Sequence, residues 1–280
     1  MSRYTQPSSA SPSPIALGER LTSTRIPSSL ASAPNLRYVA SVMPIWPQAV
    51  LFDFDGVVVN SEPLHFQAFQ EVLAQDGITL TEQEYYRDLI GFDDKGAIRQ
   101  LYETRQLPLL PRTSLALMAR KSSTMLDLIH RKKANPLPGV EEFVRHLWRR
   151  CPLAIVSGGL RDEIELMLEA VRLRDCFQFI VAAEDVSIGK PDPQGYVQAM
   201  HRISERSIAE DKIKKPLKPQ DCLVIEDAPS VIRRAKKAGF KTLAVANTYS
   251  PDQLADADWI VDSLMRAEVR KKVPALQVPA

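Results

Sequence analysis

Two carboxylates that could carry out chemistry follow the first strongly apolar run of the sequence. Residues 53–56, Asp-Phe-Asp-Gly, come directly after Ala49–Phe52. Acids at the end of a buried strand are costly unless they bind a cation or react. Because residues two apart in an extended chain share one face, the carboxylates of Asp53 and Asp55 can reach one site. A turn at Gly56 would give the two acids different roles, and a simple surface turn is the alternative.

An anion-binding segment and a fixed cation are candidates later in the chain. Ser157 and Gly158 follow the apolar run Leu153–Val156 and precede a helical pattern. A hydroxyl, a permissive backbone and free helix N–H groups can together bind an anion, although an ordinary strand-to-helix turn has the same pattern. Lys190 lies in the proline-stiffened loop Gly189–Pro193. There it can act as a fixed positive charge or simply be solvated.

A second acidic pair, Glu226 and Asp227, ends the apolar run Leu223–Ile225. Its position favours metal ligation, with two helix-capping acids as the alternative. Acids at two strand ends can hold Mg²⁺, which prefers a few carboxylates together with substrate phosphate. A serine and a lysine can bind the phosphate oxygens. One carboxylate is then left to attack phosphorus and one to move a proton, which is the chemistry of an aspartyl-phosphate intermediate.

The elements that must position these residues alternate between strands and helices. Short unbroken apolar runs predict buried parallel strands, and amphipathic stretches near 140–150, 161–172, 193–203 and 228–238 predict helices. The alternation predicts an α/β fold with a Rossmann-like parallel sheet, in which ligands bind beyond the carboxyl ends of the strands. The predicted strands are Ala49–Phe52, Leu153–Val156, Phe179–Ala182, Leu223–Ile225, Leu243–Ala246 and Trp259–Val261.

One stretch interrupts this alternation. From residue 63 to about residue 135 no clear strand pattern occurs, and apolar residues recur at helical spacing. The simplest interpretation is a helical cap inserted into an α/β core. We therefore expect a disordered N-terminal extension over 1–47, a catalytic core over 48–62 and 135–265, a helical cap over 63–134, and a C-terminal tail over 266–280.

Composition excludes several classes of protein. Of 280 residues, 45% are hydrophobic and 25% charged, with a net charge of +2, so wholesale disorder is excluded. No apolar run approaches the roughly 18 residues of a membrane span, so no membrane partner is expected. Residues 205–219 contain four lysines but favour an exposed loop over a nucleic-acid patch. Three widely spaced cysteines favour a reducing compartment.

The first 47 residues differ from the rest of the chain. They contain ten serines, seven prolines and four arginines but a single acid, Glu19. Such a segment buries too little apolar surface to fold by itself. It is a solvated tail, a start misread upstream of Met43, or an organelle transit peptide. We expect a cytoplasmic protein, or an organellar one if the extension is a transit peptide, and a monomer or small homo-oligomer.

With these motifs in this order, the sequence resembles the haloacid dehalogenase superfamily of Mg²⁺-dependent phosphohydrolases. More narrowly, it is similar to the branch of sugar-phosphate phosphatases and β-phosphoglucomutase, which has a helical cap after the first motif. The similarity spans roughly residues 48–263 and implies that Asp53 is the nucleophile and Asp55 the general acid/base. It also implies Mg²⁺ held by the Asp53 carboxylate, the Asp55 backbone carbonyl and Asp227, with Glu226 in or beside the coordination shell.

The resemblance further implies residues that bind substrate. Ser157, with Gly158 beside it, and Lys190 would bind the transferring phosphoryl group and offset its charge. His65 lies where the mutase-like members carry a histidine near the general acid. Arg161, just after the anion-binding segment, is a candidate substrate contact. A plain helix residue is the alternative for both His65 and Arg161.

Three positions depart from the family pattern. Asn60 stands where an aspartate is usual, which affects the hinge or substrate contacts, and Val231 stands where many relatives have glycine. The segment Gly91–Gly96 lacks the Arg-x-x-Ser pattern of the mutases, which grip a second phosphate in the cap. We therefore predict a Mg²⁺-dependent phosphatase for a small phosphorylated metabolite, such as a sugar phosphate. The alternatives are a phosphomutase of the same fold and a non-catalytic binding protein.

Overall fold

The computed structural model describes residues 46–90, 92–132 and 135–276. The predicted disorder of residues 1–47 thus lies outside the described residues, except at its last two positions. There, the rings of Trp46 and Trp259 lie 5.5 Å apart, and the Trp46 indole N–H donates to the Gln220 carbonyl at 3.0 Å. Trp46 therefore belongs to the folded core rather than to the extension.

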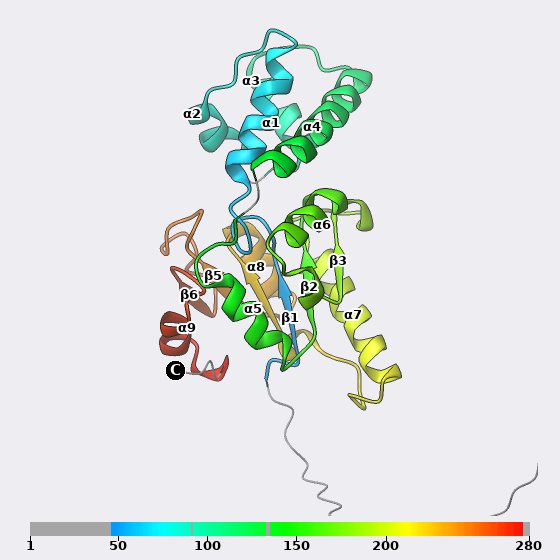
Figure 1. Ribbon diagram of the computed structural model, residues 1–280, viewed down its shortest axis with the longest axis vertical. Coiled ribbons are helices and arrows are strands. Elements are labelled where there is room, and N and C mark those ends of the chain that lie inside the picture. The colour runs from blue at the N-terminus through cyan, green and yellow to red at the C-terminus, as the bar shows by residue number, and fades with distance from the viewer. Residues whose placement is uncertain (1–45, 91, 133–134, 277–280) are drawn as a thin grey trace, which may run out of the picture. The chain divides into compact units, whose positions relative to one another are not determined.

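A six-stranded parallel sheet forms the centre of the core (Figure 1). The strand order β3-β2-β1-β4-β5-β6 places β1 between β2 and β4, where Phe52 aligns with Ile155 on one side and Ile225 on the other. This confirms the predicted α/β fold with a parallel sheet. The strands are β1 (Ala49–Phe52), β2 (Leu153–Val156), β3 (Phe179–Val181), β4 (Cys222–Glu226), β5 (Lys241–Val245) and β6 (Trp259–Val261).

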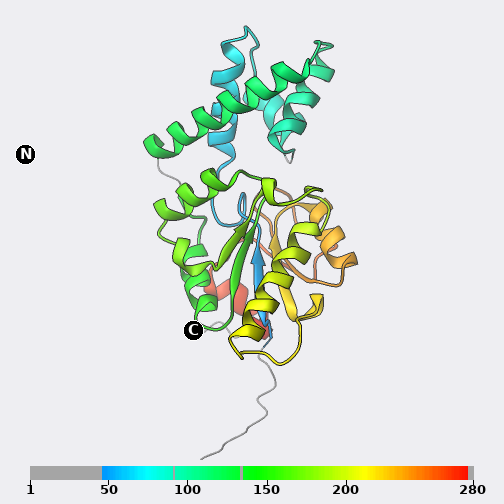
Figure 2. The same cartoon turned by 90° about the vertical axis from the view of Figure 1, so that its right-hand side faces the viewer.

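Helices cover both faces of the sheet, because strand side chains alternate between two apolar clusters. Val50 and Phe52 of β1 belong to one cluster, and Ala49 and Leu51 to the other. The first cluster includes residues of α5, α6 and α9, and the second residues of α7 and α8 (Figure 2). These helices are α5 (Val140–Trp148), α6 (Arg161–Ala170), α7 (Gln194–Ala209), α8 (Pro229–Lys237) and α9 (Arg266–Lys272), with short 3₁₀ turns η2 (Arg174–Cys176), η3 (Ala183–Asp185), η4 (Pro219–Asp221) and η5 (Pro274–Leu276).

Between β1 and β2 the chain forms a cap of helices with an apolar core of its own. Phe69 and Leu73 of α1 pack there with Ile98 of α3 and Leu117 of α4. A capping box between Thr81 and Glu84 starts the shortest of the helices. The cap elements are α1 (Glu62–Ala74), α2 (Glu82–Glu84), the π-helical turn η1 (Tyr85–Leu89), α3 (Asp94–Thr104) and α4 (Pro111–Lys132).

The two connections between core and cap lie side by side. Val59, on the way out, forms an antiparallel bridge with Pro136, on the way back. Next to it, the N–H of Leu137 donates to the carbonyl of Val58 at 3.0 Å. The two connections therefore form one paired junction, and apolar residues of α1 and α4, such as Leu64 and Met125, also belong to the core cluster.

Helix α7 runs further than predicted and shortens the loop that follows it. The helix continues to Ala209 and buries Ser207, and Leu217 is also buried. The N–H of Leu217 donates to the Ser204 hydroxyl at 2.9 Å, which ties the end of the loop to the helix. The predicted exposed loop over residues 205–219 was therefore wrong at its two ends, because buried residues flank the lysine-rich centre.

Residues 266–276 also differ from the predicted C-terminal tail. Helix α9 and the turn η5 pack against the core, and Val269, Val273 and Leu276 are each completely buried. Their spacing of four and three residues puts them on one face, and five of the other eight residues of the segment are charged. The high charge of this sequence hid a short amphipathic helix.

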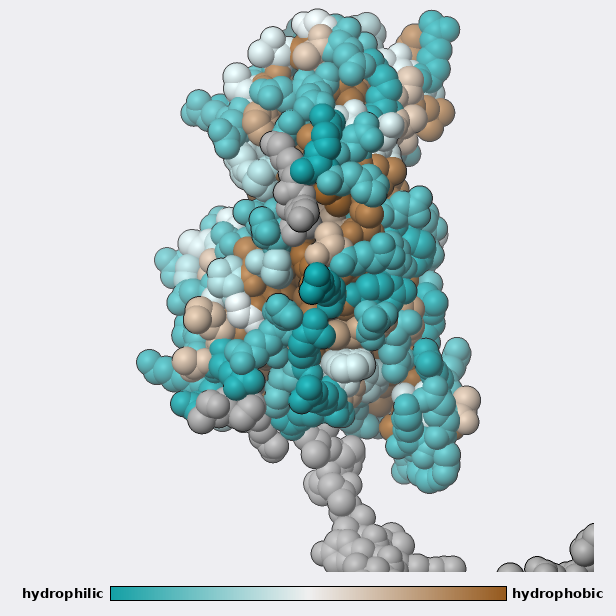
Figure 3. All heavy atoms as spheres, viewed as in Figure 1, coloured by the Kyte–Doolittle hydropathy of each residue, from teal (hydrophilic) through white to brown (hydrophobic). Residues whose placement is uncertain are grey.

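The face of the molecule shown in Figure 3 is mainly hydrophilic, as expected where the apolar side chains are buried in the core. Within the described ranges, no helix has the length and apolarity to cross a membrane. The chemistry-bearing residues instead concentrate at the carboxyl edge of the sheet, just beyond β1, β2 and β4.

Candidate active site

The first acidic motif leaves the carboxyl end of β1 and then turns sharply. The Asp53 N–H donates to the Ile225 carbonyl of β4 at 2.8 Å, which continues the sheet pairing by one residue. Gly56 then adopts a φ of +77°, in the left-handed region that favours glycine. Asp53 and Asp55 consequently line the same cavity with different neighbours.

A half-buried lysine joins the two acidic motifs. The Lys190 ammonium group contacts Asp53 Oδ1 and lies 2.7 Å from Glu226 Oε1. Although burial opposes it, the charges of these two carboxylates hold the pKa of Lys190 well above its usual value. Lys190 is thus a fixed cation at the carboxyl edge of the sheet.

Both carboxylate oxygens of Glu226 accept hydrogen bonds from groups of the protein. Its Oε1 also accepts a hydrogen bond from the Tyr196 hydroxyl at 3.1 Å. Its Oε2 accepts from the backbone N–H groups of Asp227 and Ala228, both at 2.8 Å. Since protein donors occupy both oxygens, Glu226 positions Lys190 and the start of the next loop.

Three acids lie close enough together to hold a metal ion. Asp53, Glu226 and Asp227 are buried, and one ligand oxygen from each lies within 4.8 Å of the others. Burial raises the pKa of Asp53 well above its usual range despite the opposing charge of Lys190. Burial, reinforced by the charge of Glu226, raises the pKa of Asp227 to about 8. A cluster of oxygen ligands whose charges disfavour one another fits a hard divalent cation.

Gly56 leaves the space that Asp227 occupies. A Cβ atom added to Gly56 would lie 2.1 Å from Asp227 Oδ2 and 2.9 Å from the Thr248 hydroxyl oxygen. That hydroxyl donates to Asp227 Oδ2, so the position of this carboxylate is defined from two sides. The turn after β1 and the carboxylate after β4 are therefore in direct contact.

Gly56→Ala is expected to destabilise the protein by about 1–3 kcal/mol and to weaken Mg²⁺ binding, because alanine is strained at this φ and displaces Asp227. Urea unfolding with and without Mg²⁺ measures both effects. Gly77→Ala is the matched control, since Gly77 has a φ of +73° but no atom within 4 Å of the added Cβ. Equal losses in both variants would mean that the contact with Asp227 contributes nothing.

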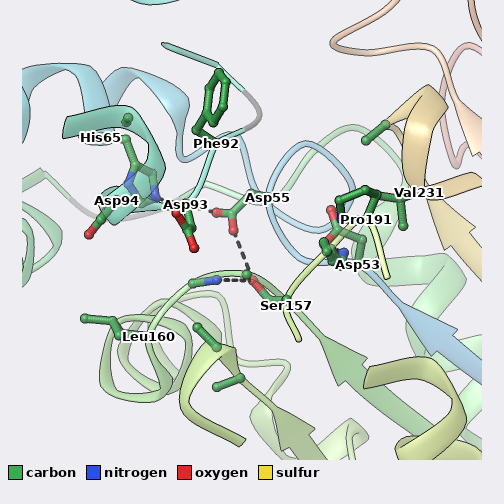
Figure 4. A pocket seen from close by; sticks show the side chains of 18 of the residues that line it. Asp53, Asp55, His65, Phe92, Asp93, Asp94, Ser157, Leu160, Pro191 and Val231 are labelled. Atoms are coloured by element: carbon green, nitrogen blue, oxygen red, sulfur yellow. Dashed lines mark hydrogen bonds and ion pairs between the residues drawn. The ribbon is translucent and has the colours of Figure 1, made fainter. Parts of the chain in front are cut away.

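Asp55 lies in a separate hydrogen-bonding environment. Its Oδ1 accepts from the Ser61 hydroxyl and lies 3.8 Å from His65 Nε2, while Oδ2 accepts from the Ser157 hydroxyl at 3.2 Å (Figure 4). Burial alone would raise the pKa of Asp55, but the interactions with His65, Ser61 and Ser157 lower it below its usual value. Ser61 is the N-cap residue of α1, yet its hydroxyl serves Asp55 instead of the helix.

The segment after β2 forms the opposite wall. The Ser157 hydroxyl accepts a hydrogen bond from the Gly159 N–H at 2.9 Å, which fixes its orientation toward Asp55 (Figure 4). Apart from Gly158 itself and its two neighbours in the chain, no described residue has an atom within 4 Å of the position that a Cβ would take there. This open backbone faces the cavity between the two acidic motifs, where a phosphoryl group could bind.

Behind His65, a charged network extends into the cap. His65 Nδ1 lies 2.9 Å from the ammonium group of Lys121, a fully buried residue of α4. Lys121 also lies 2.9 Å from Asp94 Oδ1 of the cap and 3.7 Å from Glu163 Oε2 of α6. The network therefore joins the general acid/base candidate to the cap and to the core helix after Ser157.

Comparison with known proteins identifies the family of the chain. Residues 50–245, more than half of the chain, match the family model described as haloacid dehalogenase-like hydrolase. The chain belongs to this family of hydrolases. It is 27% identical over 224 residues to validoxylamine A 7′-phosphate phosphatase of Streptomyces hygroscopicus subsp. limoneus, covering 80% of this chain and 96% of that protein.

A second phosphatase and a solved structure extend the comparison. The hydrolase is 27% identical over 199 residues to the phosphorylated carbohydrates phosphatase of Thermotoga maritima, covering 70% of this chain and 83% of that protein. Its fold matches the crystal structure of CbbY from Rhodobacter sphaeroides in complex with phosphate, with a TM-score of 0.69 and 23% identity, covering 82% and 99% of the two chains. The predicted family resemblance is thereby confirmed.

Most of the predicted site residues of the hydrolase line one cavity of about 560 Å³. Two do not. Asn60 is exposed outside the lining, and Arg161 pairs with Asp185 and donates to the Ile180 carbonyl at 3.2 Å. The predicted residues that line the cavity are Asp53, Asp55, His65, Ser157, Gly158, Lys190, Glu226 and Asp227.

Several residues at the site of the hydrolase escaped the sequence analysis. Thr248 follows β5, so its position beyond a strand end was a usable signal. Tyr196 and Glu163 lie within amphipathic helices, where nothing local distinguishes them from structural residues. Lys121 and Asp94 lie in the cap. Because the cap is helical, the rule that site residues follow strand ends cannot identify which of its side chains face the cavity.

Proposed function

We propose that the protein is a Mg²⁺-dependent phosphatase that hydrolyses a small phosphorylated metabolite through an aspartyl-phosphate at Asp53. The observation that carries this proposal is the position of Asp53 within a cluster that contains both the Lys190 ammonium group and the acids Glu226 and Asp227. A carboxylate that contacts a fixed cation and belongs to a cation-binding cluster suits attack on an anionic phosphoryl group.

In the first half-reaction, we expect Asp53 Oδ2 to attack phosphorus, since Lys190 contacts the other oxygen of this carboxylate. A bond from phosphorus to Asp53 forms while the bond from phosphorus to the leaving oxygen breaks. Asp55 gives its proton to the leaving oxygen. Lys190 and Ser157 stabilise the charge of the transferring group, with its oxygens facing the open backbone at Gly158.

In the second half-reaction, water attacks phosphorus of the phosphorylated Asp53, and Asp55 accepts a proton from that water. The bond from phosphorus to the Asp53 oxygen breaks, which restores the Asp53 carboxylate and releases inorganic phosphate. The lowered pKa of Asp55 in the free protein favours the carboxylate form required at this stage. Binding of a phosphate dianion places negative charge beside Asp55, which raises its pKa and favours the protonated form required for the first half-reaction.

Asp53 and Asp227, with the Asp55 backbone carbonyl, are the groups that would hold Mg²⁺, and Glu226 would support them from beside the ion. When bound there, a divalent cation supplies positive charge to the transferring phosphoryl group and orients it toward Asp53. The position of Asp227 supports this role, because Thr248 donates a hydrogen bond to Oδ2 and Gly56 leaves the space that this same oxygen occupies.

The relatives support a sugar phosphate as substrate. The names of the Streptomyces and Thermotoga relatives specify a 7′-phosphate of validoxylamine A and phosphorylated carbohydrates. Residues of the cap line the cavity together with the candidate phosphate-binding residues of the core, so the leaving group of a bound substrate would contact both sets of residues. A phosphorylated polyol of modest size fits such a cavity.

A panel of phosphorylated sugars and small phosphate esters tests this function. We expect phosphate release with Mg²⁺, a loss of at least about 100-fold in EDTA, and recovery when excess Mg²⁺ is restored. Free phosphate and isomerised sugar phosphate are measured in the same samples. Isomerisation with little phosphate release would indicate a phosphomutase, and neither product on a broad panel would favour a binding protein.

A further inference from the structure

Glu163 has a carboxylate oxygen that the fold leaves without a donor. It lies in the first turn of α6, is only 2% exposed and lines the cavity. Among the described residues, Oε1 has no hydrogen-bond partner, while Oε2 faces Lys121 at 3.7 Å. A buried carboxylate oxygen without a donor is costly, so this atom points to a donor supplied by a ligand.

Lys121 cannot serve as a free cation for a second phosphate. Its ammonium group has three donors and faces His65 Nδ1, Asp94 Oδ1 and Glu163 Oε2. Two carboxylates therefore share a single positive charge. A phosphate at this position would have to displace one of them from a buried ion pair.

The part of the cavity beyond the phosphate-binding residues is acidic. Four carboxylates line it and two lysines, Lys95 and Lys121, accompany them. Lys95 is exposed at the start of α3, whereas Glu163 is buried. Like charges repel a second anion here, and such repulsion is an effective source of specificity. The four acids are Glu62, Asp93, Asp94 and Glu163.

We propose that Glu163 and Asp94 form an acidic subsite that binds hydroxyl or ammonium donors of the leaving group and excludes a second anion. The substrates are then phosphate monoesters of polyols or amino polyols that carry no further phosphate or carboxylate. This inference rests on the proposed phosphatase function. Burial raises the pKa of Glu163, and a donor from the leaving group would favour its charged form.

Competition against hydrolysis of p-nitrophenyl phosphate tests the subsite, because each competitor yields an affinity whether or not it is turned over. The competitors are glucosamine 6-phosphate, glucose 6-phosphate and 6-phosphogluconate, which carry an ammonium group, no extra charge and a carboxylate. We expect affinity to fall in that order, by at least about tenfold from first to last. Equal affinities, or the reverse order, would overturn the proposal.

Glu163→Gln keeps the shape of the side chain and removes its charge, so the preference for the ammonium compound over the carboxylate compound should shrink by about threefold or more. Glu169→Gln is the matched control, since Glu169 is exposed on the same helix and lies outside the cavity lining. An unchanged preference in Glu163→Gln, with unchanged thermal unfolding, would also overturn the proposal.

Failure of the phosphatase function would give a different result. In that case the wild-type protein would show no Mg²⁺-dependent hydrolysis of p-nitrophenyl phosphate at all. The same three compounds would then be compared by calorimetric titration with Mg²⁺ present. The subsite is upheld if the ammonium compound binds most tightly and is rejected if the carboxylate compound binds as well.

Discussion

Replacing Asp53 with Asn is expected to reduce Mg²⁺-dependent phosphate release by at least about 10³-fold while the protein remains folded. An amide has almost the same shape as the carboxylate but cannot attack phosphorus. It also removes one negative charge from a cluster in which burial already disfavours the charged form of Asp53. The free energy of unfolding without Mg²⁺ should therefore stay the same or rise.

Rates on the best substrate of the panel and thermal unfolding of the same samples check this prediction. Acid quenching followed by digestion and mass spectrometry would find a phosphorylated Asp53 peptide only in the wild-type protein. Asp252→Asn is the control, because Asp252 is exposed and does not line the cavity. Retained turnover in Asp53→Asn would rule out a covalent role for this carboxylate.

Removing Lys190 is the second change with a large expected effect. Lys190→Ala leaves Asp53 and Glu226 buried without their shared cation. We expect a loss of about 3–5 kcal/mol in the free energy of unfolding, the usual cost of breaking a buried ion pair from one side. Phosphate release should fall by at least about 10³-fold as well, because the transferring group loses a fixed positive charge.

Urea unfolding at several pH values separates the electrostatic part of this loss. The unpaired acids can be neutralised by protons, so the destabilisation should be smaller at pH 5 and larger at pH 8. Lys190→Met, which retains most of the volume, should lose nearly as much as Lys190→Ala. Exposed Lys215 provides the control variant, Lys215→Ala. A loss below about 1 kcal/mol at pH 8 would show that the two acids do not depend on Lys190.

The sequence indicated which edge of the sheet carries the candidate site residues, because parallel strands place their carboxyl ends together. Once Ala49–Phe52 and Leu153–Val156 were identified as strands, Asp53 and Ser157 had to meet at one edge. The same reasoning applies to Asp227. Short apolar runs are sufficient for such a prediction, because the pairing of parallel strands places residues that are distant in the sequence beside one another.

The sequence was less informative where side-chain direction depends on helix packing. Arg161 follows the anion-binding segment closely, yet it starts α6 and turns toward Asp185 rather than into the cavity. Lys121 and Glu163 are separated by β2 and α5 in the sequence, and no local pattern indicates that a lysine of α4 becomes buried beside an acid of α6. Such pairs depend on how the cap rests on the core.

The paired junction between cap and core makes the cap a replaceable module. The chain leaves and returns at neighbouring points, Val58–Val59 and Pro136–Leu137, so a foreign cap could be grafted there without cutting the sheet. The graft would have to supply a counter-charge for Glu163, as Lys121 does now, and apolar side chains in place of those that α1 and α4 contribute to the core cluster. Substrate range could thus diverge by exchange of the insert, while the residues that we propose to transfer phosphate remain in the unaltered scaffold.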